Sequence, residues 1–172
     1  MTESRIAPPA GGFSVFDHHP PLWRTFNQFY GHLWTNGALD QPTKEAARLR
    51  NARVTGCPIC RNLRFDGARD QGLTESYVAQ ITDDYDSSAL PRRWKDAVRW
   101  TDVVIGHPAS VRAEDRTELQ SRFTPAELVE LTLMAAIAQG FSKAVVAWGG
   151  ASDMPTTIVP TPTPDRMVTS GT

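Results

Sequence analysis

The chain has 172 residues and a mass of 19.0 kDa, which is enough for one domain with a hydrophobic core and too little for two large domains. Hydrophobic residues make up 40% of the sequence and charged residues 22%, a composition that argues against disordered, collagen-like and coiled-coil proteins. The formal net charge of -1 offers no attraction to a nucleic acid backbone or an anionic membrane, so neither partner is expected.

Two further features of the sequence concern where the protein works. The longest uninterrupted apolar stretch runs from Leu133 to Ala138, far short of the roughly 20 residues that span a bilayer. Residues 1–12 have neither the basic nor the apolar region of a secretory signal, so we expect a cytoplasmic protein. Structural disulfides are rare in a reducing compartment, so the two cysteines indicate a chemical role more than a structural disulfide.

The chain opens with an arm and an aromatic helix. Residues 1–16 contain two prolines and two glycines without sustained periodicity, and we expect them to lie on the surface or on a neighbouring subunit. From Leu22 to Trp34, large apolar side chains recur at steps of three and four residues, which predicts a helix that Gly37 ends.

Three helices are predicted next. Asp40 is a typical N-cap for the second helix. Cys57 followed by Pro58 is typical of an N-cap and first turn, and it predicts a third helix that continues through Arg69. A short fourth helix is expected around residues 77–81.

The remaining helices lead to the strongest start signal in the chain. Residues 91–105 place their apolar side chains on one face, and residues 114–123 form a short polar helix. Thr124 and Glu127 match a capping box, and the apolar helix that follows to Trp148 is predicted to be the central buried helix.

No segment favours a β-strand, and the proline-rich tail of residues 151–172 is expected to be extended or mobile. The predicted fold is therefore an all-α bundle of six to seven helices over residues 17–150, between the arm of residues 1–16 and the tail.

Cys57 and Cys60 are the first candidate site residues. At a spacing of three residues on a helical turn they share a face and lie close enough for a disulfide. A helix N-terminus lowers the pKa of a thiol, and Arg64, four residues after Cys60, adds a positive charge. The residues alone leave three interpretations open: redox chemistry, two inert core cysteines, or half of a zinc site without a visible second half.

A wider pattern surrounds the two cysteines. Glu45, eleven intervening residues and Cys57-Pro58-Ile59-Cys60 are followed by Phe123-Thr124-Pro125-Ala126-Glu127-Leu128-Val129-Glu130-Leu131-Thr132. Together these motifs resemble the carboxymuconolactone decarboxylase and alkylhydroperoxidase D superfamily, over about residues 20–150. The resemblance implies an all-α, alkylhydroperoxidase D-like bundle that assembles as a homo-oligomer, a trimer or a hexamer.

The resemblance also implies roles for individual residues. Cys60 would attack a hydroperoxide, Cys57 would resolve the product as a redox-active disulfide, and Glu45 would begin a proton relay. Helix-end electrostatics alone would favour Cys57 as the attacking thiol. Glu45 has an alternative role as a carboxylate that stabilises the N-terminus of its own helix.

Two positions depart from the family pattern. Arg64 stands where the family has a histidine, and Ile59 stands where some members have another. Arginine does not act as an acid or base near neutral pH, but it binds a thiolate or a carboxylate substrate, or a structural ion-pair partner. His32, on the aromatic helix, is a candidate substitute base or an ordinary core residue.

Three functions are compatible with these residues. The first is an antioxidant peroxidase or thiol-disulfide oxidoreductase that needs no cofactor and no metal, acts on a small hydroperoxide and is restored by an external dithiol. The second is a non-redox lyase or isomerase that acts on a small carboxylate, with Arg64 as the anion-binding residue and Glu45 or His32 moving a proton. The third is an oligomeric binding protein with a vestigial site.

Overall fold

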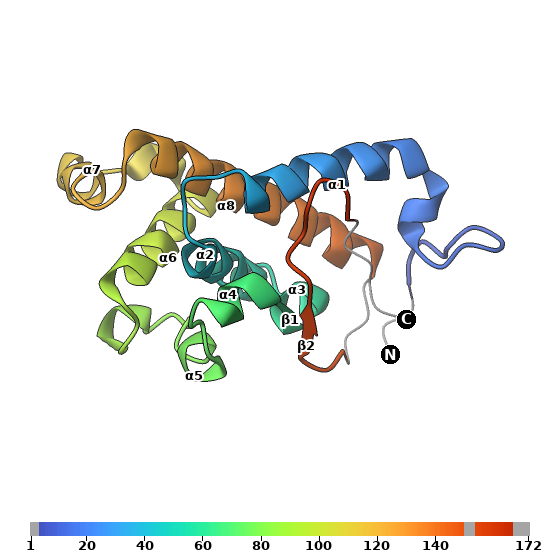
Figure 1. Ribbon diagram of the computed structural model, residues 1–172, viewed down its shortest axis with the longest axis horizontal. Helices are drawn as coiled ribbons and strands as arrows, with labels where there is room; N and C mark the ends of the chain where they lie inside the picture. The colour runs from blue at the N-terminus through green and yellow to red at the C-terminus, as the bar shows by residue number, and fades with distance from the viewer. Residues whose placement is uncertain (1–3, 150–153, 167–172) are drawn as a thin grey trace.

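The computed structural model describes residues 4–149 and 154–166, and most of them are helical (Figure 1). The elements, in chain order, are the 3₁₀ turn η1 (Val15–His18), α1 (Pro20–Thr35), α2 (Gln41–Val54), α3 (Pro58–Asn62), β1 (Leu63–Phe65), α4 (Asp66–Asp70), α5 (Glu75–Val78), η2 (Tyr85–Ser87), α6 (Arg92–Ile105), η3 (Pro108–Ser110), α7 (Ala113–Gln120), α8 (Pro125–Trp148) and β2 (Thr157–Val159). The predicted all-α fold is confirmed, with eight α-helices among the described residues because the third predicted helix is divided.

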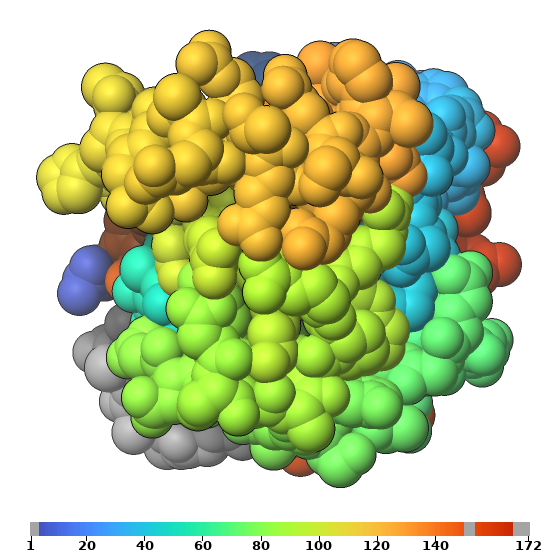
Figure 2. Space-filling view, turned by 90° about the vertical axis from the view of Figure 1, so that its left-hand side faces the viewer, coloured from blue at the N-terminus to red at the C-terminus, as the bar shows by residue number. Residues whose placement is uncertain are grey.

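Helices α2, α6 and α8 pack against one another and form the centre of the molecule (Figure 1). Two buried apolar clusters join them, one between α2 and the α4–α6 region and one between α2, α6 and α8. Figure 2 shows the end of the molecule that is covered by α6, α7 and the first part of α8. The side chains of these three helices form a continuous surface over the core there.

Helix α1 lies along α8 (Figure 1), and its Tyr30 and Trp34 are buried in the interior. Trp34 is fully buried and contacts the ring of Phe65 edge-on, with ring centroids 4.6 Å apart. Phe26 stacks on Phe141 of α8, with ring centroids 4.9 Å apart. The row of aromatic residues that predicted this helix therefore fixes α1 to both α8 and β1.

The side-chain caps predicted at Asp40 and Thr124 are confirmed, whereas Thr74, at the start of α5, makes no side-chain cap hydrogen bond. Asp40 accepts a hydrogen bond from the backbone N–H of Thr43 at 2.8 Å and caps α2. Thr124 and Glu127 form the capping box at the start of α8. Gly149 ends α8 with a φ of 83°, a left-handed conformation that glycine adopts without steric strain.

The third predicted helix is wrong in its length. Helix α3 ends at Asn62, β1 follows immediately, and α4 begins at Asp66. β1 pairs in parallel with β2, in a register that places Arg64 opposite Ile158. The expectation that no strand forms is therefore also wrong, because the partner strand comes from the distant C-terminal segment and local periodicity cannot reveal it.

The described part of the tail is extended, as expected, and is held on the domain. Asp66 accepts hydrogen bonds from the N–H and the hydroxyl of Thr161, at 2.8 and 2.7 Å. Burial alone would raise the pKa of Asp66, but these bonds outweigh it and hold the pKa below its usual value. Farther along, the tail crosses α1 at Gly31, where a Cβ atom would lie 2.2 Å from the backbone of Thr163.

The arm was expected on the surface or on a neighbouring subunit, and its described part contacts its own chain. The backbone N–H of Arg5 donates a hydrogen bond to the carbonyl of Trp148 at 2.8 Å. Phe16 of η1 stacks on Trp23 with ring centroids 3.6 Å apart. Residues 1–3, 150–153 and 167–172 of the arm, linker and tail lie outside the described residues.

The prediction that α8 is the central buried helix needs correction. By length and composition α8 could cross a membrane, and one of its faces buries Leu131 and Met134 against the bundle. Its opposite face exposes Val129 and Leu133. The helix buried on all sides is α2, in which every residue from Pro42 to Ala52 is buried.

Candidate active site

A disulfide joins Cys57 and Cys60 at the N-terminus of α3, with Cα atoms 5.3 Å apart. Cys57 is the N-cap residue, and its Sγ accepts a hydrogen bond from the N–H of Cys60 at 3.2 Å. Cys57 is completely buried, whereas Cys60 is 7% exposed. The cap position and the helical turn therefore place both sulfur atoms together, as the spacing predicts.

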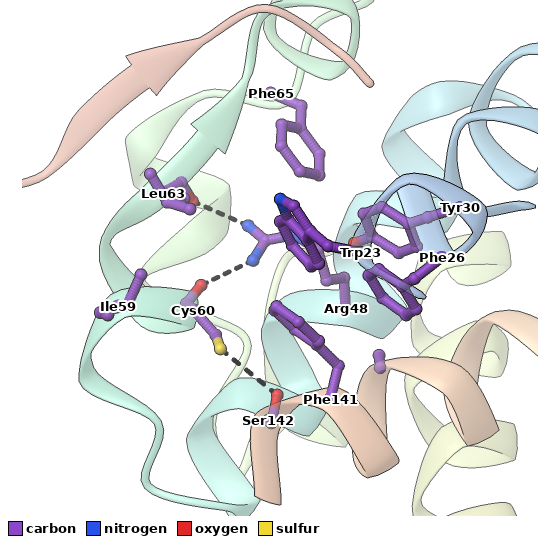
Figure 3. Close-up of a pocket in the computed structure, with 11 residues that line it drawn as sticks. Trp23, Phe26, Tyr30, Arg48, Ile59, Cys60, Leu63, Phe65, Phe141 and Ser142 are labelled. Carbon is purple, nitrogen blue, oxygen red and sulfur yellow. Dashed lines mark hydrogen bonds between the residues drawn. The ribbon is translucent and has the colours of Figure 1, made fainter. Parts of the chain in front are cut away.

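Cys60 lies in the wall of a small cavity of about 50 Å³ (Figure 3). The lining is mostly apolar, includes five aromatic side chains, and comes from α1, α2, α3, β1 and α8: Trp23, Phe26, Tyr30, Arg48, Ile59, Cys60, Leu63, Phe65, Ala138, Phe141 and Ser142. The predicted aromatic helix thus supplies one wall, and the cysteine helix supplies the opposite wall. Cys57 is not among the lining residues.

Arg48 of α2 is the positively charged residue in the described lining of this cavity, and its guanidinium makes several hydrogen bonds. Its Nε and Nη2 donate to the two carboxylate oxygens of Glu45, each at 2.6 Å. Nη1 donates to the carbonyl of Cys60 at 2.6 Å, and Nη2 donates to the carbonyl of Leu63 at 2.7 Å. The guanidinium also lies over the ring of Phe65, 4.9 Å from its centroid. Arg48 therefore ties α2 to the turn that carries the disulfide.

Glu45 and Arg48 form an ion pair whose two charged groups are both buried. Burial alone would lower the pKa of Arg48, but the charge and the hydrogen bonds of Glu45 outweigh it, and the pKa is raised. Burial also raises the pKa of the neighbouring Tyr30 to about 12, against a smaller opposite effect of Arg48. Tyr30 consequently keeps its proton at physiological pH.

Ser142 of α8 contacts the sulfur that faces the cavity. Its hydroxyl donates a hydrogen bond to Cys60 Sγ at 3.4 Å and accepts one from Asn51 Nδ2 at 3.0 Å. Both Ser142 and Asn51 are buried. A chain of hydrogen bonds thus runs from α2 through α8 to the disulfide.

Three of the five predicted site residues come together. Cys57 and Cys60 form the disulfide, and Glu45 lies behind it, joined through Arg48 to the carbonyl of Cys60. Glu45 Oε1 also accepts a hydrogen bond from the backbone N–H of Phe65 at 3.3 Å. The carboxylate is 1% exposed, and its direct partner is Arg48 rather than a cysteine.

Arg64 does not lie in the cavity wall. The prediction placed it one helical turn beyond Cys60, but α3 ends at Asn62 and Arg64 is in β1. Its guanidinium pairs with Glu75 at 3.0 Å and donates to the carbonyl of Arg61 at 2.6 Å. An extended residue no longer shares the helical face of the residue four positions earlier, so the expected contact with Cys60 is absent here.

His32 also lies away from the disulfide. The histidine is on the exposed side of α1, where its Nδ1 lies 2.6 Å from Asn36 Nδ2. It lines a separate surface groove together with Phe29, Val129 and Leu133. The cavity that contains Cys60 has no histidine in its described lining.

Two residues of the cavity, Arg48 and Ser142, are not among those predicted from the sequence. Arg48 could have been found from its spacing of three residues after Glu45, which places a carboxylate and a guanidinium on one side of a helix. Nothing in the local sequence around Ser142 indicates its contact with a sulfur atom 82 positions earlier in the chain. Trp23, Phe26 and Tyr30 were recognised as an apolar helix face, and only packing shows that this face is a cavity wall.

Comparisons with known proteins agree with this architecture. A protein of unknown function from Agrobacterium tumefaciens, described as a candidate antioxidant defence protein AhpD, has a similar structure with a TM-score of 0.68. The match covers 85% of this chain and 95% of that protein, at 15% sequence identity. At that identity the similarity shows a shared fold.

Two uncharacterized proteins from Mycobacterium tuberculosis, MT2376 of strain CDC 1551 and Rv2313c of strain H37Rv, are each 36% identical over 118 residues. The match covers 68% of this chain, which spans 42% of the length of these relatives.

A sequence model of the carboxymuconolactone decarboxylase family matches residues 20–115, more than half of the 172 residues. The matched segment contains Glu45, Arg48 and both cysteines. The resemblance to the carboxymuconolactone decarboxylase family is confirmed, and the chain belongs to that family.

Proposed function

We propose that this protein is a thiol-dependent peroxidase in which Cys60 attacks a small organic hydroperoxide and Cys57 resolves the product. The observation that carries this proposal is the Cys57–Cys60 disulfide with Cys60 in the wall of an aromatic cavity. A disulfide is the oxidised product of such a reaction, and the cavity gives a substrate a place next to one sulfur.

The proposed reaction balances in three steps. The Cys60 thiolate attacks the terminal oxygen of ROOH, the O–O bond breaks, and Cys60 becomes a sulfenic acid while RO⁻ takes a proton from water and leaves as ROH. The Cys57 thiol then attacks the sulfenic sulfur, forms the disulfide and releases water. An external dithiol supplies two electrons and two protons, which restore both thiols, and is itself oxidised to a disulfide.

The positions and the exposed fractions of the two cysteines support these roles. Cys60 lines the cavity, whereas Cys57 is fully buried behind it. A hydroperoxide in the cavity therefore meets Cys60 first. Cys57 at the helix N-cap is placed to close the disulfide without leaving the turn.

The cavity lining supports a neutral, apolar substrate. Aromatic and aliphatic side chains form most of the wall, and Glu45 already neutralises the charge of Arg48 through two hydrogen bonds. This pairing disfavours the alternative of a lyase that holds a substrate carboxylate at this site. Arg64, the anion-binding residue of that alternative, is paired with Glu75 outside the lining.

Consumption of cumene hydroperoxide by the dithiothreitol-reduced protein tests the proposal. We expect turnover with dithiothreitol as the reductant, and the loss of two free thiols after one equivalent of peroxide. Cys60→Ser should abolish turnover, whereas Cys57→Ser should trap a sulfenic acid on Cys60 that dimedone labels. If both thiols stay titratable after peroxide treatment, the protein is not a peroxidase and the lyase or binding-protein alternatives gain support.

A further inference from the structure

Ser142 lies on α8 opposite the disulfide, and its hydroxyl points to a sulfur atom rather than to its own helix (Figure 3). The Oγ–Sγ distance to Cys60 is 3.4 Å, and Ser142 is 2% exposed. Among the described side chains that line the cavity, Ser142 is the one that donates a hydrogen bond to Cys60 Sγ. A hydroxyl donor next to a sulfur in a water-poor site stabilises negative charge on that sulfur.

The direction of this hydroxyl is unusual for a helical residue in this protein. A Ser or Thr inside a helix commonly donates to the carbonyl four residues earlier. Five helical threonines here do so: Thr25, Thr35, Thr101, Thr117 and Thr132. Ser142 instead donates across the helix interface to Cys60. Its orientation therefore comes from the tertiary structure around the disulfide.

Asn51 of α2 determines which way the Ser142 proton points. Asn51 Nδ2 donates to Ser142 Oγ at 3.0 Å, so the hydroxyl oxygen acts as an acceptor there and its hydrogen is left for Cys60. Asn51 is completely buried, and its Oδ1 has no hydrogen-bond partner among the described residues. An unpaired buried amide oxygen lowers stability, so packing alone does not account for asparagine at this position.

We propose that Ser142, oriented by Asn51, donates the hydrogen bond that stabilises the Cys60 thiolate in the reduced protein. The proposal rests on the thiol redox function proposed above. After an external dithiol has reduced the disulfide, the Cys60 thiol releases its proton to water, and the thiolate that remains accepts the Ser142 hydrogen bond. A serine hydroxyl is no base near neutral pH, so Ser142 stabilises the charge and does not carry the proton away.

The pH dependence of Cys60 alkylation tests this role without any peroxide. The reduced protein is treated with iodoacetamide over a range of pH, and fragment-ion mass spectrometry separates modification of Cys60 from that of Cys57. For Ser142→Ala we expect an acid dissociation constant of the Cys60 thiol about tenfold lower than in the wild type, the size of effect that one lost hydrogen bond to a charged group produces. Its alkylation profile then moves to higher pH.

Thr101→Val is the matched control, because Thr101 is also fully buried and loses only a bond to the carbonyl of Ala97. This control should lose some stability and keep the wild-type alkylation profile. An unshifted profile in Ser142→Ala would overturn the proposal. So would an equal shift in Thr101→Val, because the shift would then follow from general loosening of the fold.

If Ser142→Ala does not fold, the alkylation profile of Asn51→Leu tests the proposal. This variant keeps the hydroxyl, removes the group that orients it, and also removes the unpaired amide oxygen. A profile shifted to higher pH supports the proposal, and a wild-type profile overturns it. Because alkylation needs no hydroperoxide, a shifted profile in a protein without peroxidase turnover would refute the proposed function and leave the role of Ser142 standing.

Discussion

Apolar helices are usually more buried than polar ones, and helices α2 and α8 show the opposite. Five charged or amide side chains of α2 are buried: Lys44, Glu45, Arg48, Arg50 and Asn51. α8 has three charged residues among its 24, yet Val129 is 62% exposed and Leu133 is 43% exposed. The polar helix α2 is therefore buried in the interior of the fold, and the apolar helix α8 presents one of its faces to solvent.

The difference comes from what each helix meets. Every charged side chain buried on α2 has a partner from another part of the fold or from α2 itself. Lys44 pairs with Glu130 of α8 at 2.6 Å, and Arg50 pairs with Asp102 of α6 at 2.6 Å. Such pairs offset the loss of hydration that would otherwise keep these charges at the surface. The exposed face of α8, with Val129 and Leu133, is not covered by any of the residues that the structure describes.

Breaking the buried pair on α2 should have the largest effect. Glu45→Leu leaves the Arg48 guanidinium buried without its carboxylate, and we expect a loss of about 3–5 kcal/mol in the free energy of unfolding. Urea unfolding followed by circular dichroism measures the loss. The double variant Glu45→Leu/Arg48→Met should recover much of it, and a double variant as unstable as Glu45→Leu alone would show that the pair matters beyond its charge.

Two leucines on α8 test the exposed face next. Leu131 is completely buried and Leu133 is 43% exposed on the same helix. Leu131→Ala should lower the free energy of unfolding by about 2–5 kcal/mol, because it opens a cavity in the core. Leu133→Ala should change it by about 0.5 kcal/mol or less in the monomer. Similar losses for both would contradict the observed orientation of α8.

The exposed face also bears on assembly. We propose that Phe29, Val129 and Leu133, which border one surface groove, are covered by a second copy of the chain in the expected homo-oligomer. Leu133→Glu should then lower the mass measured by light scattering. A wild-type protein that is monomeric at micromolar concentration would contradict this proposal.

Tyr30 offers a pH test of the α1–α2 contact. Its pKa is raised from 10.0 to about 12 in the folded protein, mainly by burial. The unfolded chain loses this proton at lower pH than the folded chain, so the stabilising contribution is complete below pH 10 and is lost as the pH rises towards 12. The loss amounts to about 2–3 kcal/mol.

Tyr30→Phe should remove this part of the alkaline destabilisation. Urea unfolding at several pH values between 9 and 11 compares the variant with the wild type, and Tyr77→Phe on the half-buried Tyr77 serves as the control. If Tyr30→Phe and the wild type lose stability in parallel over this range, the burial of Tyr30 does not control its ionisation.

Arg64→Ala should have a smaller effect than loss of the buried Glu45–Arg48 pair, of Leu131 or of the Tyr30 hydroxyl. Its partner Glu75 has a side chain that is 49% exposed, and water screens much of the attraction between them. Arg64→Ala should therefore lower the free energy of unfolding by roughly 1 kcal/mol and leave the alkylation profile of Cys60 unchanged. Slower alkylation in this variant would mean that Arg64 reaches the thiolate in the reduced protein, as the sequence pattern first predicted.

Local signals explain why much of the fold was predictable. The Asp40 cap, the Thr124–Glu127 box and the aromatic repeat of residues 22–34 act within a few residues, and each marks a helix that the structure contains. The spacing of Cys57 and Cys60 likewise determines their proximity, because one helical turn brings the two side chains together.

The sequence by itself therefore determined the helical class, most helix starts, the family and the cysteine pair. Tertiary structure alone decided that residues 63–65 form a strand, since their partner is the distant segment of residues 157–159. Because Arg64 lies in that strand, it does not contact Cys60. The packing of α2 and α8 places Arg48 and Ser142 next to Cys60 instead. Contacts between residues far apart in the chain leave no periodic pattern in the sequence, because they depend on how whole helices pack.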